Sequence, residues 1–338
     1  HEVKNIARPV LVWRWAVSGT GAPRASETTN QPLPRPEDPS IAVLPFANMS
    51  GDQEQEYFAD GITEDIITSM SEVSNLFVIA KNSAFAFKGS TANVQEIGRD
   101  LGVCYILTGS VRKAGKRVRV TAQLADAHKG QQLWAERYDR DLDDIFAIQD
   151  ELSLKIVSSA TVKLSDRDAR RLTQRGTENI DAYDHLLRGR DQLSRHTPEA
   201  NAQALAHFEQ AAAIDPDYAA SYVHLAETYL QQLQLGWSAD PTKLLSRARN
   251  YAERAITLDD EYGPGHGVLG QIKLWQKDYD GAVAGGERRV TLNPSDAEGL
   301  ATFAMTLMFS GDPERALVAI ETAMRLDPQY PFWHLHVV

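Results

Sequence analysis

Few stretches of this sequence combine residue types and spacing suited to chemistry. The string Gly265-His266-Gly267-Val268-Leu269-Gly270 matches the G-x-G-x-x-G pattern of dinucleotide-binding loops. That pattern needs a preceding strand within a βαβ unit, whereas these residues lie in a helical repeat, so we interpret Gly270 as a small packing residue. The segment Gly109–Lys116 approaches a phosphate-binding loop, but it is one residue too long, and Arg117 stands where Ser or Thr would hold magnesium.

Basic residues crowd one predicted hairpin. A contact with a nucleotide or nucleic acid is one interpretation of this cluster. A charged run at a turn is more often a solvated edge that blocks strand pairing, and we favour that interpretation. The cluster consists of Arg112, Lys113, Lys116, Arg117 and Arg119.

Acidic residues and histidines supply two further candidates. Asp60, Glu64 and Asp65 have the chemistry of a metal or acid/base cluster, but acidic residues in the first turn of a helix usually complement the helix dipole. His334 and His336 lie after the last full repeat without further ligands nearby. The sequence contains no G-x-S-x-G or H-E-x-x-H motif and no Cys/His nucleophile arrangement. We therefore expect no catalytic, cofactor-binding or metal site in this chain.

Composition narrows the class of protein. A chain of 338 residues is long enough for two or three domains. The net charge of −11 argues against a nucleic-acid surface, which would need clustered Lys and Arg. The single cysteine, Cys104, lies in an apolar run, so neither a disulfide framework nor a cysteine metal site is expected. No apolar stretch reaches the roughly 18 residues of a membrane span, and no leader is seen, so we expect a cytoplasmic location.

The order of predicted elements divides the chain into five parts. Residues 1–17 contain one strand, 18–40 form a Pro-rich linker, and 41–164 form an α/β or α+β module of order β-α-β-α-β-β-β-α. Residues 165–180 form a linker helix, and 181–338 form an all-α solenoid. Within the module we expect strands at Ile41–Phe46, Leu76–Ala80, Cys104–Arg112, Val118–Asp126 and Gln132–Tyr138 and helices at Phe58–Met70, Val94–Leu101 and Ile145–Leu164.

A repeat dominates the second half of the sequence. Four related peptides end at Pro216, Asp260, Pro294 and Pro328, which are 44, 34 and 34 residues apart. A period of 34 residues is that of tetratricopeptide (TPR) helical hairpins, and the small and large residues fall where that motif requires them. In the third repeat an apolar and a small residue are replaced by Gly286 and Arg289, so we expect its second helix to be loose.

Stacked hairpins of this kind form a concave groove that binds extended peptides or helices. We therefore expect a protein or peptide partner. The residues predicted to contact it, at equivalent positions of the first helices, are Tyr222, Tyr229, His266, Lys273, Leu300 and Leu307.

The module resembles the TolB amino-terminal-like module, which often precedes TPR repeats in bacterial regulators. The matching segments are Ile41–Phe46, Asn48–Asp52, Tyr57–Gly61, Tyr105–Val111 and Leu133–Asp139. Together with the repeats, this resemblance covers about 300 residues and implies a regulatory α/β module ahead of a partner-binding TPR array.

Residues Val3–Trp15 resemble the last strand of class III adenylate/guanylate cyclase catalytic domains. This resemblance implies a homodimeric cyclase in which catalytic domain, module and array follow in order. Family members hold two metal ions on a pair of aspartates, so the parent would need Mg²⁺ or Mn²⁺ with ATP or GTP. Those aspartates would lie upstream of His1, and none is transferred to this chain. We expect this chain to regulate: the array docks a partner, and the module senses or relays.

Two other classes of protein stay open. Winged-helix transcriptional regulators also carry TolB-like and TPR regions, but the polar linker and the cyclase-like strand favour the cyclase. An adaptor in envelope assembly is the third class, by analogy with TolB itself. The ligand of the array, the stimulus and the oligomeric state are not fixed by the sequence.

Overall fold

The computed structural model describes residues 39–330 except 161, 175 and 239. Within these residues the chain forms an α/β module followed by a helical solenoid, as predicted. The predicted strand near Val10 and the histidines His334 and His336 lie outside the described residues. The module contains β1 (Ser40–Val43), β2 (Ala47–Asn48), α1 (Glu56–Ser71), β3 (Phe77–Val78), α2 (Lys81–Phe85), α3 (Val94–Leu101), β4 (Tyr105–Ala114), β5 (Arg117–Asp126), β6 (Gln131–Asp141) and α4 (Ile145–Ser159).

The module is built on a mixed sheet of strand order β3-β1-β4-β5-β6, with β2 paired to β4. The β1 strand is parallel to both neighbours, with Ile41 opposite Val78 on one side and Tyr105 on the other. The β4, β5 and β6 strands form the predicted antiparallel meander. The parallel start and the antiparallel end of the sheet are therefore both confirmed.

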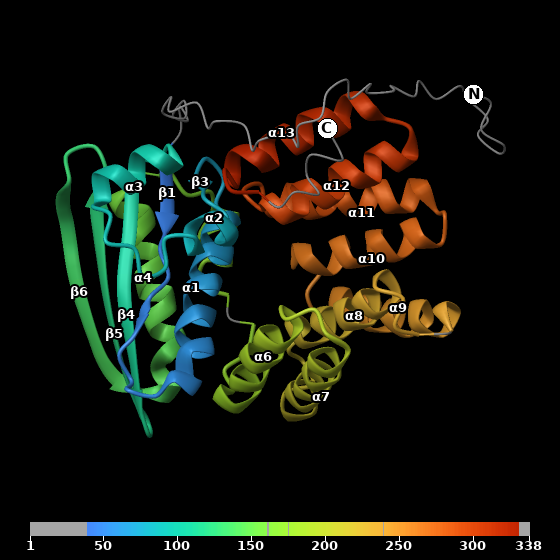
Figure 1. Cartoon of the computed structure of the whole chain (residues 1–338), viewed down its shortest axis with the longest axis horizontal. Helices are drawn as coiled ribbons and strands as arrows, with labels where there is room; N and C mark the ends of the chain where they lie inside the picture. Colours follow the sequence, from blue (N-terminus) through green and yellow to red (C-terminus); the bar gives the residue numbers. More distant parts are fainter. Residues whose placement is uncertain (1–38, 161, 175, 239, 331–338) are drawn as a thin grey trace, which may run out of the picture. The chain divides into compact units, whose positions relative to one another are not determined.

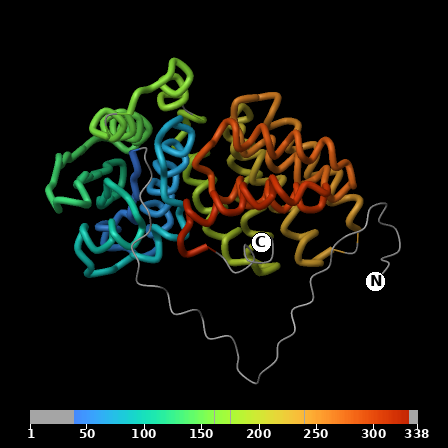
Figure 2. Tube along the Cα trace, turned by 90° about the horizontal axis from the view of Figure 1, so that it is seen from above, coloured from blue at the N-terminus to red at the C-terminus, as the bar shows by residue number. Residues whose placement is uncertain are grey.

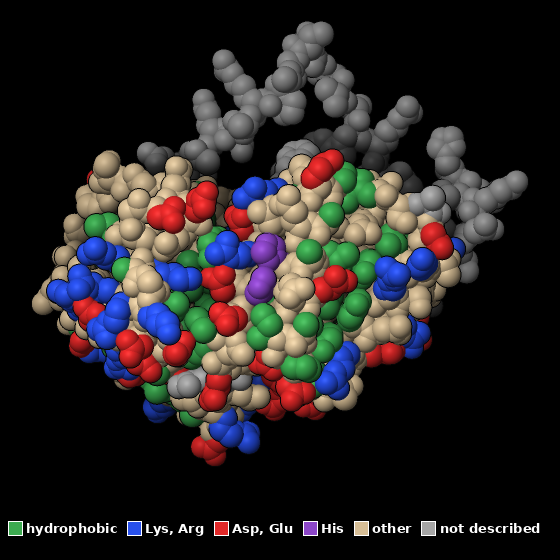
Figure 3. Space-filling view, turned by 90° about the horizontal axis from the view of Figure 1, so that it is seen from below, with side chains coloured by type: hydrophobic (Ala, Val, Ile, Leu, Met, Phe, Trp, Pro, Cys, Tyr) green, Lys and Arg blue, Asp and Glu red, His purple; other side chains and the backbone are tan. Residues whose placement is uncertain are grey.

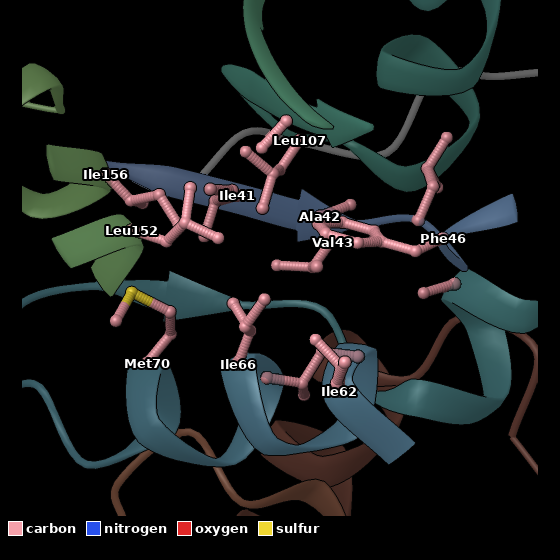
Figure 4. Close-up of a cluster of buried hydrophobic side chains, with 14 of the residues drawn as sticks. Ile41, Ala42, Val43, Phe46, Ile62, Ile66, Met70, Leu107, Leu152 and Ile156 are labelled. Atoms are coloured by element: carbon pink, nitrogen blue, oxygen red, sulfur yellow. The ribbon is translucent and has the colours of Figure 1, made fainter. Parts of the chain in front are cut away.

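The two long helices of the module, α1 and α4, pack beside each other on one face of this sheet (Figure 1). Alternate residues of β5 point into the core beneath them, and most of the intervening residues are charged or polar, as expected for a sheet with one buried face. Ile41, Ala42 and Val43 are fully buried between the helix side chains Ile62, Ile66 and Met70 and those of α4 (Figure 4).

Several predicted boundaries were wrong for local physical reasons. The strand at Leu76–Ala80 is shorter because the Ala80 amide leaves the sheet and donates to the Leu326 carbonyl of the solenoid, at 2.9 Å. The helix predicted to reach Leu164 ends at Ser159, where the hydroxyls of Ser158 and Ser159 bond back to a carbonyl of the last turn. Residues 165–180 contain only a short helix, α5 (Asp166–Arg171), in place of a continuous linker helix.

The solenoid consists of four antiparallel helix pairs that stack in order (Figure 2). Each pair ends at one of the repeated peptides identified in the sequence. The pairs are α6 (Ile180–Leu193) with α7 (Pro198–Ile214), α8 (Ala219–Gln234) with α9 (Pro241–Leu258), α10 (Gly263–Trp275) with α11 (Tyr279–Leu292), and α12 (Ala297–Ser310) with α13 (Pro313–Leu326).

The second helix of the third repeat is regular and not loose as expected. A Cβ on Gly285 would lie 2.8 Å from the Cα of Gly270, so paired glycines let α10 and α11 approach closely. Gly286 makes room for the ring of Phe303 in the same way. Arg289 is buried, and its Nε donates to the Asp296 carboxylate at 2.7 Å. The unusual residues of this repeat therefore serve close packing.

We predict that Phe46→Ala lowers the free energy of unfolding by about 3–5 kcal/mol, as for other buried aromatic truncations. Phe46 is fully buried, and its ring fills the space beside Gly109. Urea unfolding followed by circular dichroism measures the loss. Leu133→Ala is the control, because Leu133 lies exposed on β6 and should change the free energy by less than about 0.5 kcal/mol. Equal losses for the two variants would contradict this account of the core.

Candidate partner-binding surface

The two predicted contact residues of the first helix in the second repeat pack against the second helix of the same hairpin. Tyr222 and Tyr229 of α8 turn toward α9 of the same hairpin, where both rings pack against Tyr251 at centroid distances of 6.3 and 6.0 Å. Tyr229 is only 4% exposed, and its hydroxyl accepts a hydrogen bond from Arg247. Its ring belongs to the packing between two helices.

The other four predicted residues occupy the same positions in the following repeats. Lys273 packs toward α11, close to Gly281. His266 is fixed by a 2.7 Å contact between its Nε2 and the Asp260 carbonyl oxygen. Leu300 and Leu307 contribute to the core of the last hairpin, and Leu307 is 1% exposed. Burial therefore removes Tyr229 and Leu307 from the accessible surface. A binding role stays a prediction for Tyr222, His266, Lys273 and Leu300.

One face of α6, the first helix of the first repeat, packs against the module. Tyr183 and Arg190 of α6 both contact α1 of the module. Arg190 Nη1 donates to the Asp65 carboxylate at 2.7 Å, and its other amino group pairs with Glu64. The Tyr183 hydroxyl donates to Asp65 as well. We call these contacts between α1 and α6 the seam.

Apolar packing continues across the seam. Tyr183 and Leu187 belong to the same buried cluster as the core of the module. The Tyr183 ring meets Phe146 edge-on at 5.1 Å. A Cβ on Gly61 would lie 2.6 Å from a Leu187 methyl group, so glycine at this point of α1 allows the two helices to touch. The module and the first repeat therefore share one core.

The acidic cluster and part of the basic hairpin acquire partners at the seam. Glu64 pairs with Lys81 as well as Arg190, and Asp60 pairs with Lys88. Lys113 of β4 donates to Asp184 of α6 at 3.0 Å, and Tyr57 donates to the same carboxylate at 2.7 Å. Asp60, Glu64 and Asp65 are thus explained by ion pairs with other helices or, for Asp60, with the turn after α2, rather than by the helix dipole alone.

The repeat-ending peptides also face the module and its linker. In each of the four repeats, a polar side chain next to the end of the second helix bonds to a residue outside the array. The pairs are Asp215 with Thr177, Asp259 with Arg171, Ser295 with the Leu76 carbonyl, and Asp327 with Ser83. One edge of the array is therefore occupied by the chain itself.

Each first helix carries one small buried residue that packs against the second helix of its hairpin. Counting along the sequence from this residue gives the positions equivalent to Tyr183 and Arg190 in every repeat. Arg190 directly follows Gly189, and Glu227, Gln271 and Met305 directly follow Ala226, Gly270 and Ala304. Tyr183 corresponds to Ala220, Pro264 and Glu298 by the same count. These positions lie two residues before the predicted ones, which at about 100° per residue places this face about 200° away, on nearly the opposite side of each first helix. That shift in the helical pattern is the signal that would have found the face.

Acidic groups distinguish this face. The carboxylates of Glu227 and Glu298 lie close enough to influence one another. Glu298 is exposed, yet the protein mass around it, together with the negative charges of Asp296 and Glu227, raises its pKa despite the nearby Arg289. Burial alone would raise the pKa of Glu227. The contact between its carboxylate and His224 Nδ1, at 2.7 Å, outweighs burial and lowers that pKa.

The basic hairpin is largely committed to internal pairs. Arg117 and Arg119 both pair with Asp139 on β6, at 2.7 and 2.6 Å. Their hydrogen bonds lower the pKa of Asp139 to about 2. On the face of the molecule in Figure 3, acidic and basic side chains are interspersed. These pairs support the interpretation of the hairpin as a solvated edge.

The two glycine-containing motifs of the sequence lie in regular secondary structure or a turn between strands. Gly265–Gly270 lies within α10, and Gly109–Lys116 lies on β4 and its turn. Among the described residues, no group of three or more His, Cys, Asp or Glu is arranged to hold a metal ion. No helix in the described part of the chain is both long and apolar enough to cross a membrane.

Comparison with known proteins gives two kinds of relative. A family described as the second domain of HilA/YgeH-like transcriptional regulators matches residues 37–157. "Putative adenylate cyclase 3" of Rhizobium meliloti is 44% identical over 282 residues, which are 83% of this chain and 48% of that protein. The transcriptional regulator HilA of Salmonella typhimurium is 30% identical over 150 residues, which are 44% of this chain and 27% of HilA. The chain thus spans about half or less of these relatives.

Two solved structures are similar to parts of the chain. One is TTC0263, a TPR protein of Thermus thermophilus, at 19% identity and a TM-score of 0.40, covering 57% of this chain and 94% of that one. The other is TolB from Acinetobacter baumannii, at 22% identity and a TM-score of 0.30, covering 39% of this chain and 31% of that one.

We predict that Arg190→Ala destabilises the folded chain by about 3 kcal/mol, because it leaves Glu64 and Asp65 partly buried without their shared cation. Urea unfolding measures the loss, and limited proteolysis between residues 160 and 180 reports whether the seam has opened. Arg195→Ala is the matched control, since Arg195 pairs with Asp191 at the surface and should cost less than about 1 kcal/mol. A loss for Arg190→Ala no larger than for the control would contradict this account.

The seam should also weaken in acid. Burial alone would raise the pKa of Glu64, but the charges of Arg190 and Lys81 outweigh burial and lower it. The stability that Glu64 contributes is therefore present above its ordinary pKa of about 4.3 and is lost as the pH falls through the lower folded value. We expect Glu64→Gln to be less stable than the wild type at pH 7, with a difference that shrinks toward about pH 3. Urea midpoints of both proteins across this range measure it; a difference independent of pH would refute the assignment.

Proposed function

We propose that this chain is the non-catalytic regulatory and partner-binding region of a bacterial adenylate cyclase signalling protein. The array docks a protein partner, and the α/β module, which we interpret as TolB-like, transmits the event to a catalytic domain elsewhere in the parent. That domain would use Mg²⁺ or Mn²⁺ with ATP, and its chemistry needs no residue of this chain.

The observation that carries this proposal is the similarity to the cyclase-named relative. Its 282 matched residues leave only 56 of 338 unmatched, so the match must include parts of both the module and the array. Shared residues in both parts support a shared arrangement of module and array, and the 44% identity supports a related role. The free Cys104 suits a reducing cytoplasm.

The seam supplies a physical route for regulation. Because α1 and α6 share a core and an ion-pair network, a partner that shifts the array would also act on α1. The α1 helix packs directly against one face of the sheet of the module. We propose that the module and the array therefore respond as one unit to binding.

A transcriptional regulator is the second candidate. The match of residues 37–157 to the second domain of HilA/YgeH-like regulators favours it, and it involves the module but not the array beyond residue 157. In such a protein a DNA-binding domain would take the place of the cyclase domain, while this chain would keep its role in binding partners.

The full reading frame of the gene distinguishes the two candidates. We predict that the purified full-length protein converts ATP to cyclic AMP with Mg²⁺ or Mn²⁺, and that Arg190→Ala changes this rate by about fivefold or more, as expected if the seam couples the domains. A chromatographic assay for cyclic AMP measures the rate, with Arg195→Ala as control. A protein without cyclase activity that binds DNA in a sequence-specific manner would establish the second candidate instead.

A further inference from the structure

An apolar strip remains uncovered on two neighbouring helices of the array. Trp275 is 47% exposed and Phe309 59%, and Met308 is 37% exposed beside them. Leu274 and Met305 are partly exposed next to these residues. We call these five residues the α10–α12 face. Exposed apolar patches of this kind usually mark interaction sites.

The repeat places these side chains together. Trp275 and Phe309 are 34 residues apart, so they take equivalent positions on α10 and α12, which pack against each other. The axes of packed helices lie roughly 8–10 Å apart. Along α12, Glu298, Met305 and Phe309 follow a helical period over three turns, a length of about 16 Å. The face is therefore long enough for several turns of a bound helix.

The seam shows what kind of ligand this surface accepts. Tyr183 and Arg190 of α6 hold positions equivalent to Glu298 and Met305 of α12, and their ligand is the helix α1. Met305 of the α10–α12 face lies on this row in the fourth repeat, and Phe309 follows it one helical turn later. A helix is thus the secondary structure already bound by this row within the chain.

The charges of the array indicate which charge a bound helix should carry. At the seam the array contributes the cation Arg190 and the bound helix contributes the carboxylates Glu64 and Asp65. On the later repeats the array contributes carboxylates instead, from Glu227 and Glu298. Among the described residues no cation lies within ion-pair distance of Glu298, although the more distant charges of Arg289 and Lys81 act on it. A ligand of the later repeats would therefore need positive charge.

We infer that the α10–α12 face binds an amphipathic helix of a protein partner whose apolar side chains are flanked by Lys or Arg. This inference rests on the proposed role of the array in binding partners and specifies the chemistry of that partner. Trp275 and Phe309 supply large, rigid contacts, and the flexible side chains Met305 and Met308 adapt to the apolar face of the ligand. Glu298 of α12, together with Glu227 of α8, pairs with the basic flank.

The test uses the whole chain and three synthetic 16-residue peptides labelled with a fluorophore. One carries Leu on one helical face and Lys on the other, the second replaces every Lys by Glu, and the third scrambles the first. Fluorescence anisotropy should show binding of the Lys peptide at least about tenfold tighter than of the other two. Trp275→Ala with Phe309→Ala should weaken binding by about tenfold or more, and Glu298→Gln by about fivefold.

Two controls separate this face from general attraction to an acidic protein. Leu133→Ala removes an exposed apolar side chain on β6, and Glu209→Gln removes an exposed charge on α7. Both should bind the Lys peptide as the wild type does. Equal weakening by Glu209→Gln and Glu298→Gln, or equal binding of the Lys and Glu peptides, would overturn the inference. Circular dichroism of each variant establishes that it is folded.

Three further outcomes are decisive. If the chain forms dimers in sedimentation that Trp275→Ala dissociates, and the Lys peptide does not bind, the face is an interface between copies and the inference is wrong. The proposed function fails separately: a full-length protein without cyclase activity whose array still selects the Lys peptide would leave the inference standing. If a partner regulates cyclase activity equally in the wild type and in the variants of the α10–α12 face, the proposed function stands and the inference about this face is wrong.

Discussion

The guanidinium of Arg190 is shared by two carboxylates of α1, and the arrangement of the chain depends on that contact. Arg190 comes from the first helix of the array, whereas Glu64 and Asp65 come from the first helix of the module. All three side chains are largely shielded from water, so removing one of them leaves an uncompensated charge. Gly61 lets the helices approach closely enough for the pairs to form. The seam therefore fixes which helix faces remain available elsewhere.

A solenoid of helical hairpins needs its first repeat covered, because each repeat buries its faces only against its neighbours. Here α1 provides that cover, and Tyr183 and Leu187 enter the core of the module. The side chains beside the repeat ends extend the contact along one edge, from Asp215 to Asp327. The longest of these contacts join residues more than 200 positions apart in the sequence, which makes the module a structural part of the array.

This arrangement divides the array by function. The first repeat and the edge of the repeat ends are occupied by the chain itself, whereas the equivalent positions of the later first helices are at least partly exposed. A change of charge accompanies that division, since the cation Arg190 of the first repeat is replaced by Glu227 on the second. A regulatory region built this way would read a partner on the later repeats and pass the effect through the seam to the module.

The sequence by itself determined the long elements and their order, because local patterns specify them, whereas the short β2 and α2 were not predicted. The alternating residues of β5, the Asn93 cap and the Gly102 stop of α3, and the 34-residue spacing of the array are all readable from neighbouring residues. The same repeat pattern selected Tyr229 and Leu307 as contact residues, yet both are buried within their own hairpins. Only the tertiary structure decided that Arg190 meets Glu64 and Asp65, and that Arg289 is buried rather than disruptive. Those partners lie far apart in the sequence or on separate helices, and an ion pair between them forms only after packing has brought both charges out of water.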